Sequence, residues 1–461
     1  MPAGAGRDTA INSFFTTLEA AGQVPYAQDN QTAFLYRSNT ATSVAFPGDH
    51  TGWSASASSA TATRLGTTDI WIKELTFPTD ARVDYKVVTN GNNWILDPRN
   101  PLQMWGGFGP NNELRMPDYT FAQETVRHPG VPMGNLTPNI ITASTNLGYN
   151  VQYRVYTPAG YDAAAMSNLP VVYITDGHEF AADHLGSVVV TLDNLIASHE
   201  LNPTIAVFID PRGPGTGFNR RETEYTGNPD YADFVADELV TAIDAAYRTN
   251  PSPAGRTILG DSLGGGNSAY FGLTRSDTFE NIAVLSPSTV LGLSGVYNAF
   301  STAGLQNDLN FFLTYGTIGD GNGGPNLFNI LSNNGYNVTR TTANEGHSWG
   351  NWRAPDQDIL TGLIGSTADG RSQRRRFRRR RDLNVVLGNW NAGTPPNTGL
   401  AIPEPASVTC AHCSRSPSAT AACGLARLNP SGTPSPSPAY RTPAAGRGDA
   451  FEVLVCDRRT S

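Results

Sequence analysis

The sequence predicts an α/β domain with a mostly parallel central sheet, preceded by a small all-β region and followed by a low-complexity tail. Between residues 31 and 120, short apolar runs are separated by Gly, Asn, Asp and Pro, a pattern typical of short antiparallel strands. From residue 141, apolar runs alternate with helical patterns over about 225 residues, which indicates parallel strands covered by helices on both faces. The length of 461 residues, 39% of them hydrophobic, allows more than one core.

The all-β region is predicted to be a sandwich that spans residues 26–120, followed by a linker at 121–140 that is rich in Pro and Gly. Its strand-like runs are TAFLYRS, TSVAFPG, DIWIKELTFP, ARVDYKVVTNG and NNWILDPRNP. Trp53, Trp71 and Trp94 are interpreted as packing residues, since aromatic side chains of a small sandwich are mostly core. A platform on which a sugar stacks is the alternative.

The α/β domain is predicted to span residues 141–365. Its expected strands are, in chain order, VQYRVYTPAGY, PVVYITDG, TIAVFIDP, RTILG, NIAVLSPS, NFFLTYG and YNVTRTTANEGH. Between them, YADFVADELVTAIDAAYR places residues such as Phe234 and Ile243 on one apolar helical stripe. In such a sheet, reactive groups gather at the C-terminal ends of the strands.

The charges are divided unevenly along the chain. Residues 366–461 carry 14 arginines and six acidic residues, so residues 1–365 hold 18 basic and 34 acidic residues and a net charge of −16. An acidic body argues against a nucleic-acid partner. No run of about 18 apolar residues is present that could span a bilayer.

The tail, residues 366–461, is predicted to be disordered because segments such as RSQRRRFRRRR and SGTPSPSPAYRTPAAGRG are of low complexity. It holds every cysteine of the chain, so the body is expected to fold without disulfides. The pair in CAHC has the spacing of half a zinc site, but a second pair at suitable spacing is missing. No metal ligand and no cofactor are therefore predicted.

The segment TILGDSLGGGNSAYFGL, residues 257–273, places Ser262 in a G-x-S-x-G motif between an apolar strand and a helix. Small residues at 260 and 264 allow the tight turn that leaves the serine hydroxyl exposed at the edge of the sheet. A glycine-rich turn with an idle serine is the alternative. If Ser262 is a nucleophile, the N–H of Leu263 is one donor of an oxyanion hole, and the loop after PVVYIT supplies the second, from Gly177 or His178.

A serine nucleophile needs a histidine base that is oriented by a carboxylate. Only His347 and His412 follow Ser262, and His412 lies in the tail, so His347 is the predicted base. Asp320, in a glycine-rich loop after NFFLTYG, is the predicted acid. Two other carboxylates are less suitable, because Asp308 precedes that strand and Glu345 is too near His347 along the chain.

Five separated motifs, VVYITDG, GFNRRETEY, TILGDSLGG, LTYGTIGDG and EGHSWGNWR, occur in an order that resembles the enterochelin esterase-like family of α/β-hydrolases. This family includes siderophore, feruloyl and acetylxylan esterases and relatives of the mycolyltransferases. The resemblance covers about residues 141–362 and implies the same three roles for Ser262, Asp320 and His347. The order of motifs in the all-β region likewise resembles the immunoglobulin-like domains that precede such enzymes.

The segment NRRETEY resembles the arginine-rich segment of that family. Arg220 and Arg221 are interpreted as members of structural ion pairs, and contact with the substrate is the alternative. His178 is interpreted as a polar loop residue, and a place in the substrate pocket is its alternative. In the tail, DLNVVLGNWN resembles the end of a dockerin-type calcium repeat, and IPEPAS resembles a Pro-Glu-Pro sorting signal. Both are incomplete, which is consistent with reading-frame shifts, and no calcium ligand is predicted.

The sequence thus predicts a serine carboxylic-ester hydrolase that needs no cofactor and acts on carbohydrate-linked or aromatic esters, such as feruloyl or acetyl xylan. A siderophore esterase, an acyltransferase with the same triad and a non-catalytic glycan-binding protein are the alternatives. The expected partner is a small-molecule or polysaccharide-linked ester, and no oligomeric state is predicted. The tail remnants favour export, whereas the chain is cytoplasmic if Met1 is the genuine start, since no secretory signal follows it.

Overall fold

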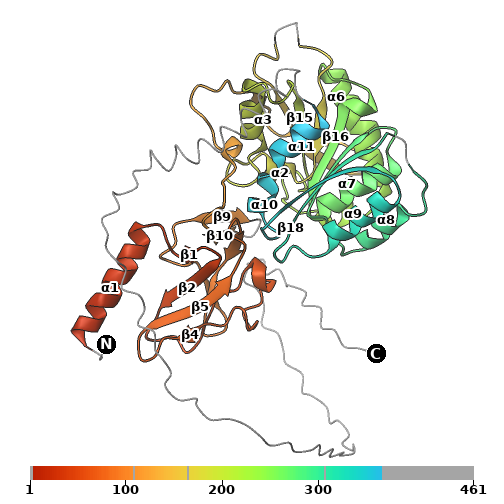
Figure 1. Cartoon of the computed structure of the whole chain (residues 1–461). Coiled ribbons are helices and arrows are strands. Elements are labelled where there is room, and N and C mark those ends of the chain that lie inside the picture. Colours follow the sequence, from red (N-terminus) through yellow and green to blue (C-terminus); the bar gives the residue numbers. More distant parts are fainter. Residues whose placement is uncertain (1–3, 107–108, 163–165, 306–307, 366–461) are drawn as a thin grey trace, which may run out of the picture. The chain divides into compact units, whose positions relative to one another are not determined.

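The computed structural model describes residues 4–106, 109–162, 166–305 and 308–365. The N-terminal region consists of three small antiparallel sheets, with the strand orders β1-β2-β5-β4, β3-β7-β8 and β6-β10-β9 (Figure 1). Their strands are β1 (Tyr26–Gln28), β2 (Gln31–Arg37), β3 (Val44–Ala45), β4 (Thr63–Arg64), β5 (Ile70–Thr76), β6 (Arg82–Tyr85), β7 (Val87–Thr89), β8 (Asn93–Ile95), β9 (Gln103–Gly106) and β10 (Gly109–Arg115). A 3₁₀ turn, η1 (Asp49–Thr51), follows β3.

One apolar core holds these three sheets together. Phe34 of β2, Tyr85 of β6 and Leu114 of β10 are buried in it, and the rings of Phe34 and Tyr85 meet edge to face at 4.9 Å. The all-β character of the region is therefore confirmed, and its immunoglobulin-like identity stays a prediction. Trp71 is buried in the same core, so it cannot belong to a sugar-stacking platform, whereas Trp94 is 44% exposed.

A helix that the sequence analysis did not anticipate, α1 (Ala5–Ala20), precedes the sheets. Its Phe15 and Leu18 pack against Leu35 and Ile70 of the all-β region. Phe15 and Leu18 are three residues apart, which places them on one face of the helix.

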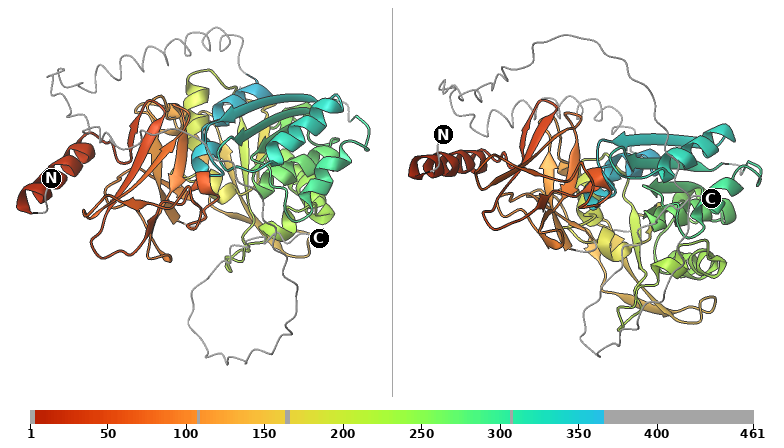
Figure 2. Two further views of the ribbon diagram at one scale, coloured as in Figure 1. Left: turned by 60° about the horizontal axis from the view of Figure 1, so that its bottom comes forward. Right: turned by 90° about the horizontal axis from the view of Figure 1, so that it is seen from below.

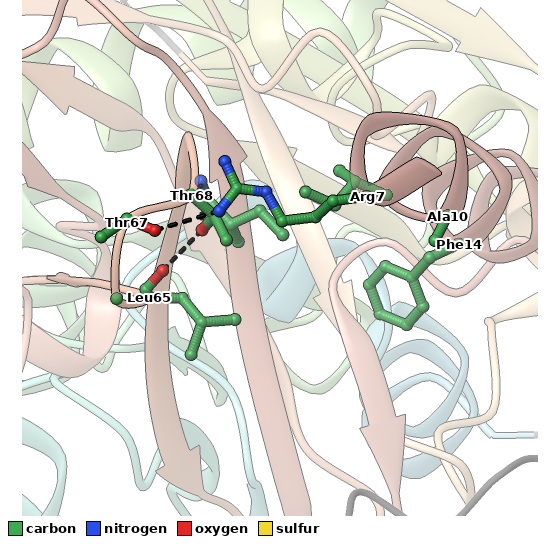
Figure 3. A pocket seen from close by; sticks show the side chains of 9 residues that line it. Arg7, Ala10, Phe14, Leu65, Thr67 and Thr68 are labelled. Carbon is green, nitrogen blue, oxygen red and sulfur yellow. Dashed lines mark hydrogen bonds between the residues drawn. The ribbon is translucent and has the colours of Figure 1, made fainter. Parts of the chain in front are cut away.

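A pocket lies between α1 and the turn at residues 65–70 (Figure 3). Arg7 of the helix reaches across it and donates a hydrogen bond to the Thr67 hydroxyl at 3.0 Å. Phe14 and Leu65 add apolar surface to its lining. None of the three predicted catalytic residues lines this pocket.

The second region is built on one large sheet with the order β11-β13-β15-β14-β16-β17-β18-β19, in which β12 also pairs with β13. Pairing is antiparallel from β11 to β15 and parallel from β15 to β19, as predicted for most of the sheet. Its strands are β11 (Asn135–Leu136), β12 (Ile140–Ala143), β13 (Asn150–Thr157), β14 (Val171–Ile174), β15 (Ile205–Asp210), β16 (Arg256–Asp261), β17 (Asn281–Leu285), β18 (Asn310–Gly316) and β19 (Asn337–Ala343).

Helices cover both faces of this sheet (Figure 1; Figure 2). One face packs against α5 (Pro229–Asp233), the π-helical segment η3 (Phe234–Leu239), α6 (Val240–Ala246), α7 (Leu263–Thr274), α8 (Leu293–Ala299) and α9 (Gly323–Asn333). The other packs against α2 (Gly177–Phe180), α3 (Val188–Ala197), α10 (Trp349–Arg353) and α11 (Asp356–Leu363). The remaining helical elements are η2 (Gln123–Thr125), α4 (Arg221–Glu224) and η4 (Pro253–Gly255).

Successive side chains of a strand point to opposite faces of the sheet, which explains why both faces carry an apolar core. In β16, Ile258 belongs to the core under α7, whereas its neighbour Leu259 belongs to the core under α3. Strands that are buried on both sides read as continuous apolar runs, and that is why they were recognisable in the sequence.

The structure differs from the expected linker at residues 121–140. Strand β11 within this segment pairs with β13 at the edge of the large sheet. The side-chain amide of Asn194 in α3 also donates to the backbone carbonyl of Glu124 at 2.8 Å. Prolines and glycines suggested an unpaired connection, but the free edge of β13 offers backbone partners to this segment.

The predictions for the tail, residues 366–461, lie outside the described residues. Within the ranges given above, no helix is both long and apolar enough to cross a bilayer. The same ranges contain no cluster of three or more His, Cys, Asp or Glu residues with the geometry of a metal site.

We expect the helix that follows Ser262 to depend on the core for its position. Phe271 of α7 is completely buried and meets the rings of Tyr231 and Phe279. Phe271→Ala should therefore lower the free energy of unfolding by about 3–5 kcal/mol, because it leaves a cavity. The matched substitution Phe218→Ala, at a side chain that is 68% exposed, should change it by less than about 0.5 kcal/mol. Urea unfolding of both variants measures the difference, and equal losses would contradict this packing.

Candidate active site

Ser262 lies between β16 and α7 in a backbone conformation that is rare for residues other than glycine, with φ of 54° and ψ of −114°. Its N–H donates to the carbonyl of Leu285 at 2.9 Å, and its own carbonyl accepts from Ser288 at 2.9 Å. The turn is thus tied to the neighbouring strand β17. The expected strand, sharp turn and helix are all present around Ser262.

Glycines make this turn possible because the chain is crowded on both sides of it. A Cβ atom at Gly260 would lie 2.4 Å from the carbonyl oxygen of Gly264, and one at Gly264 would lie 2.6 Å from the Thr175 hydroxyl. Distances below 3.0 Å are not tolerated by real Cβ atoms. The two small residues of the motif therefore let β16, α7 and the end of β14 approach one another.

The imidazole of His347 connects Ser262 with Asp320. Its Nε2 lies 2.9 Å from the Ser262 hydroxyl oxygen, and its Nδ1 lies 2.6 Å from Oδ1 of Asp320. A carboxylate only accepts hydrogen bonds, so Nδ1 carries the proton and Nε2 is left to accept from the serine hydroxyl. The ring edge rests against Trp352 of α10, at 4.9 Å between centroids, which fixes its plane.

The side chain of Asp320 is more enclosed than that of His347. Its side chain is 1% exposed, compared with 36% for His347. Its second oxygen, Oδ2, accepts from the Gly316 N–H at 2.5 Å and from the Ser286 hydroxyl at 2.7 Å. Three hydrogen bonds therefore hold the carboxylate in the orientation that faces His347.

Ser286 is a site residue that the sequence analysis missed. It follows β17 directly, has a φ of 42° and is buried. The signal was present in NIAVLSPS, where a small polar residue ends a buried strand beside the strand that carries Ser262. The side-chain amide of Asn351 lies 3.5 Å from the Ser286 hydroxyl and continues this polar network.

The two predicted oxyanion donors follow neighbouring strands, Gly177 after β14 and Leu263 after β16. The register pairs Ile174 of β14 with Leu259 of β16, and the Thr175 N–H still donates to the Leu259 carbonyl at 3.0 Å. Gly177 and Ser262 each follow this last pair by three residues, just beyond the ends of the two strands. Gly177 and Leu263 are the first residues of α2 and α7, where backbone N–H groups have no partner within their own helix.

An ion pair buttresses the turn that carries Gly177. The Nε of Arg221 lies 2.7 Å from Oδ1 of Asp176, and its Nη2 lies 3.7 Å from Oδ2 of Asp261. Burial raises the pKa of Asp176, although Arg221 opposes this effect. Burial, followed by the charge of Asp176, also raises the pKa of Asp261 well above its usual value. Arg221 therefore forms an ion pair with Asp176 and approaches Asp261, the residue before Ser262.

Arg220 and His178 have partners other than those of Arg221. The guanidinium of Arg220 lies over the ring of Tyr149, 4.2 Å from its centroid. His178 Nδ1 lies 3.5 Å from Oδ1 of Asp210, and burial lowers the pKa of His178 to about 4, so the ring is neutral at physiological pH. Burial and the charge of Asp176 raise the pKa of its neighbour Glu179 to about 7.

Apolar side chains are exposed on two loops at this edge of the sheet. Val290 and Leu291, 57% and 54% exposed, follow Ser288, whose N–H contacts Ser262. Phe218, 68% exposed, lies on the loop after β15. Each of these two loops follows a parallel strand of the sheet.

Comparison with known proteins finds a family match for part of the chain. Residues 144–308 match the family described as "Putative esterase". The uncharacterized protein YjcH of Bacillus subtilis (strain 168) is 28% identical over 144 residues, which make up 31% of this chain and 58% of that protein. The chain thus matches somewhat more than half the length of this relative.

Two solved structures share the fold. The enterobactin esterase FES of Shigella flexneri, crystallised in the presence of enterobactin, has 19% identity and a TM-score of 0.59, over 73% of this chain and 94% of that one. The ferric enterobactin esterase of Salmonella typhimurium has 18% identity and a TM-score of 0.61, over 74% and 95%. The partial match to an esterase family agrees with the family that the motifs predicted, and the two solved structures show that the chain shares the α/β-hydrolase fold of these enterobactin esterases.

Proposed function

We propose that this protein hydrolyses carboxylic esters through a covalent acyl-enzyme formed on Ser262. The observation that carries the proposal is the unbroken chain of hydrogen bonds from the Ser262 hydroxyl through His347 to Asp320. A hydroxyl alone is a weak nucleophile at neutral pH, and a base at 2.9 Å that is itself oriented by a carboxylate removes this weakness.

In the first half of the reaction, the Ser262 oxygen attacks the ester carbonyl carbon while Nε2 of His347 takes the hydroxyl proton. The resulting imidazolium is stabilised by the Asp320 carboxylate, which stays ionised. Collapse of the tetrahedral intermediate breaks the bond to the alcohol oxygen, and His347 returns the proton to that oxygen. Water then attacks the acyl-enzyme by the same route, which releases the acid and restores the Ser262 hydroxyl.

The negative charge of the tetrahedral intermediate needs donors on the side away from His347. The N–H groups of Leu263 and Gly177 are our candidates, because each begins a helix just after one of two neighbouring parallel strands. The ion pair between Arg221 and Asp176 supports this turn from behind. A rigid turn suits an oxyanion hole, since donors that are already oriented need no rearrangement during the reaction.

We propose esters with an aromatic ring in the acyl part, such as feruloyl esters of plant polysaccharides, as the substrate class. The exposed apolar side chains Val290 and Leu291 support this choice, because they follow Ser288, whose N–H donates to the Ser262 carbonyl, and a ring bound near Ser262 could cover them. A catecholate siderophore ester also presents a ring. The fold similarity to the two enterobactin esterases makes it the second candidate.

Replacement of the nucleophile gives the first test. Ser262→Ala should reduce kcat for a chromogenic ester by a factor on the order of 10⁵, because the covalent step is lost. Ser268→Ala is the matched control: it removes a buried hydroxyl from the same helix, and that hydroxyl has no hydrogen-bond partner in the described part of the chain. The control should retain full activity, and comparable rates in both variants would exclude Ser262 as the nucleophile.

The choice of the acid gives the second test. Asp320→Asn places an amide opposite His347 and disfavours the tautomer that leaves Nε2 free, so kcat should fall by about 10³- to 10⁴-fold. Asp308→Asn makes the same change at the exposed carboxylate that precedes β18, and kcat should stay within about twofold of wild type. Steady-state kinetics of the two variants decide between the carboxylates, and a larger loss for Asp308→Asn would reverse the assignment.

A substrate panel tests the acyl group. Feruloyl, acetyl and catecholate-bearing esters of one alcohol should be compared by kcat/KM. We expect the ring-bearing esters to exceed the acetyl ester by roughly tenfold or more, since burying a ring contributes at least about 1.4 kcal/mol. Leu291→Ser should reduce this preference and leave the acetyl rate near wild type. An acetyl ester that is hydrolysed as well as the ring-bearing esters would contradict the proposed class.

A further inference from the structure

Arg82, in strand β6 of the N-terminal region, is completely buried and surrounded by carboxylates. Its Nε lies 2.8 Å from Oε1 of Glu113, and its Nη2 lies 2.5 Å from Oδ1 of Asp84. Both partners belong to the all-β region. A guanidinium presents five N–H donors in a rigid plane, so these two contacts leave further donors available.

The remaining donors of Arg82 reach the segment that carries His347. Its Nη1 lies 3.3 Å from Oε2 of Glu345 and 3.2 Å from the Ser348 hydroxyl, so the two contacts flank the imidazole-bearing residue on both sides. The backbone N–H of Arg82 also donates to the carbonyl of Asn344 at 3.0 Å.

Helix α10, which follows this segment, is fitted to the same guanidinium. A Cβ atom at Gly350 would lie 2.0 Å from Cζ of Arg82, so only glycine allows the helix to approach this closely. Trp352, which fixes the plane of the His347 ring, belongs to that helix. Arg82 therefore contacts the loop that carries His347 and also the helix that carries Trp352, the packing partner of the His347 ring.

Asp49 of the N-terminal region provides an independent contact with both catalytic loops. A Cβ atom at Gly319, next to Asp320, would lie 1.9 Å from the Asp49 carbonyl oxygen. One at Gly346, next to His347, would lie 2.1 Å from the Asp49 side-chain carboxyl carbon. The Asp49 carboxylate is in turn held by the N–H of Asp84, at 2.8 Å.

We propose that Arg82 is a positioning residue for the reaction, which holds the segment Asn344–Ser348 in the conformation that presents His347 to Ser262 and Asp320. This inference rests on the proposed function. It gives the N-terminal β region a role in forming the triad, separate from any part it plays in binding substrate. Arg82 acts through the loop and touches no reacting atom.

A matched pair of substitutions separates positioning from general stability. Glu345→Gln and Glu113→Gln each neutralise one carboxylate partner of Arg82 and keep an oxygen acceptor, but only Glu345 belongs to the His347 segment. Burial raises the pKa of Glu345 to about 7, although Arg82 opposes this effect. Burial also acts to raise the pKa of Glu113, but Arg82 and Arg115 outweigh it and the pKa is lowered.

The pKa directions set the expected order for stability, whereas the contacts of Arg82 with the His347 segment set the opposite order for activity. A lowered pKa in the fold means that ionised Glu113 stabilises the protein at pH 8, whereas a raised pKa means that ionised Glu345 costs stability there. Glu113→Gln should therefore lower the unfolding temperature by more than Glu345→Gln does. In contrast, Glu345→Gln should lower kcat by about fivefold with KM within twofold of wild type, while Glu113→Gln keeps kcat within about twofold.

The experiment uses the full chain and has a readout that does not require activity. Amide hydrogen exchange of the peptide that contains residues 344–350 should rise several-fold in Glu345→Gln and stay unchanged in Glu113→Gln. Unchanged exchange in Glu345→Gln, or kcat losses that follow the losses of unfolding temperature in both variants, would overturn the proposal. A wild-type protein without Ser262-dependent hydrolysis would refute the proposed function, and the exchange data would still decide whether Arg82 holds the segment.

A double-mutant cycle tests Arg82 itself. Arg82→Lys keeps the positive charge, but a single ammonium cannot reproduce the contacts of the guanidinium on both sides of His347. If Glu345 acts through Arg82, Glu345→Gln should reduce kcat by less than about twofold in the Arg82→Lys background. Effects on kcat that multiply would show that Glu345 acts by another route and would overturn the proposal. Ser348→Ala, which removes one neutral contact, should give a smaller kcat loss of about two- to threefold.

Discussion

The left-handed backbone of Ser262 is the constraint on which the rest of the site depends. A residue with a side chain adopts this conformation only at a cost of about 1–3 kcal/mol, which the surrounding structure must offset. Here the hydrogen bonds to Leu285 and Ser288 and the close approach at Gly260 and Gly264 hold the turn. In return, the hydroxyl projects from the carboxyl edge of the sheet, where His347 can reach it.

The same sheet geometry assembles the other groups. Because β14, β16, β17 and β18 are parallel neighbours, residues that follow them meet at one edge. Asp176, Ser262 and Ser286, each at or just beyond the end of a strand, all have positive φ angles. One of these sharp turns places Ser286 where its hydroxyl donates to Asp320, and another presents Ser262 to His347.

Local patterns made the fold predictable from the sequence, and they pointed to the three residues that the structure joins by hydrogen bonds. The strands of the large sheet are buried on both faces and appear as apolar runs, and the order Ser262, Asp320, His347 left one usable histidine. Helix α1 was missed because it buries little beyond Phe15 and Leu18. Ser286 and Arg82 were also missed, since their importance arises from contacts between residues far apart in the chain, and no local spacing records such contacts.

The most direct test of the central claim is to trap the covalent intermediate. The protein should be mixed with an activated ester, quenched with acid during turnover, digested and mapped by mass spectrometry. The account predicts an acyl group on the peptide that contains Ser262, and its absence from the same peptide of Ser262→Ala. Turnover of the ester without any acyl group on Ser262, or with the label on another residue in both proteins, would contradict it.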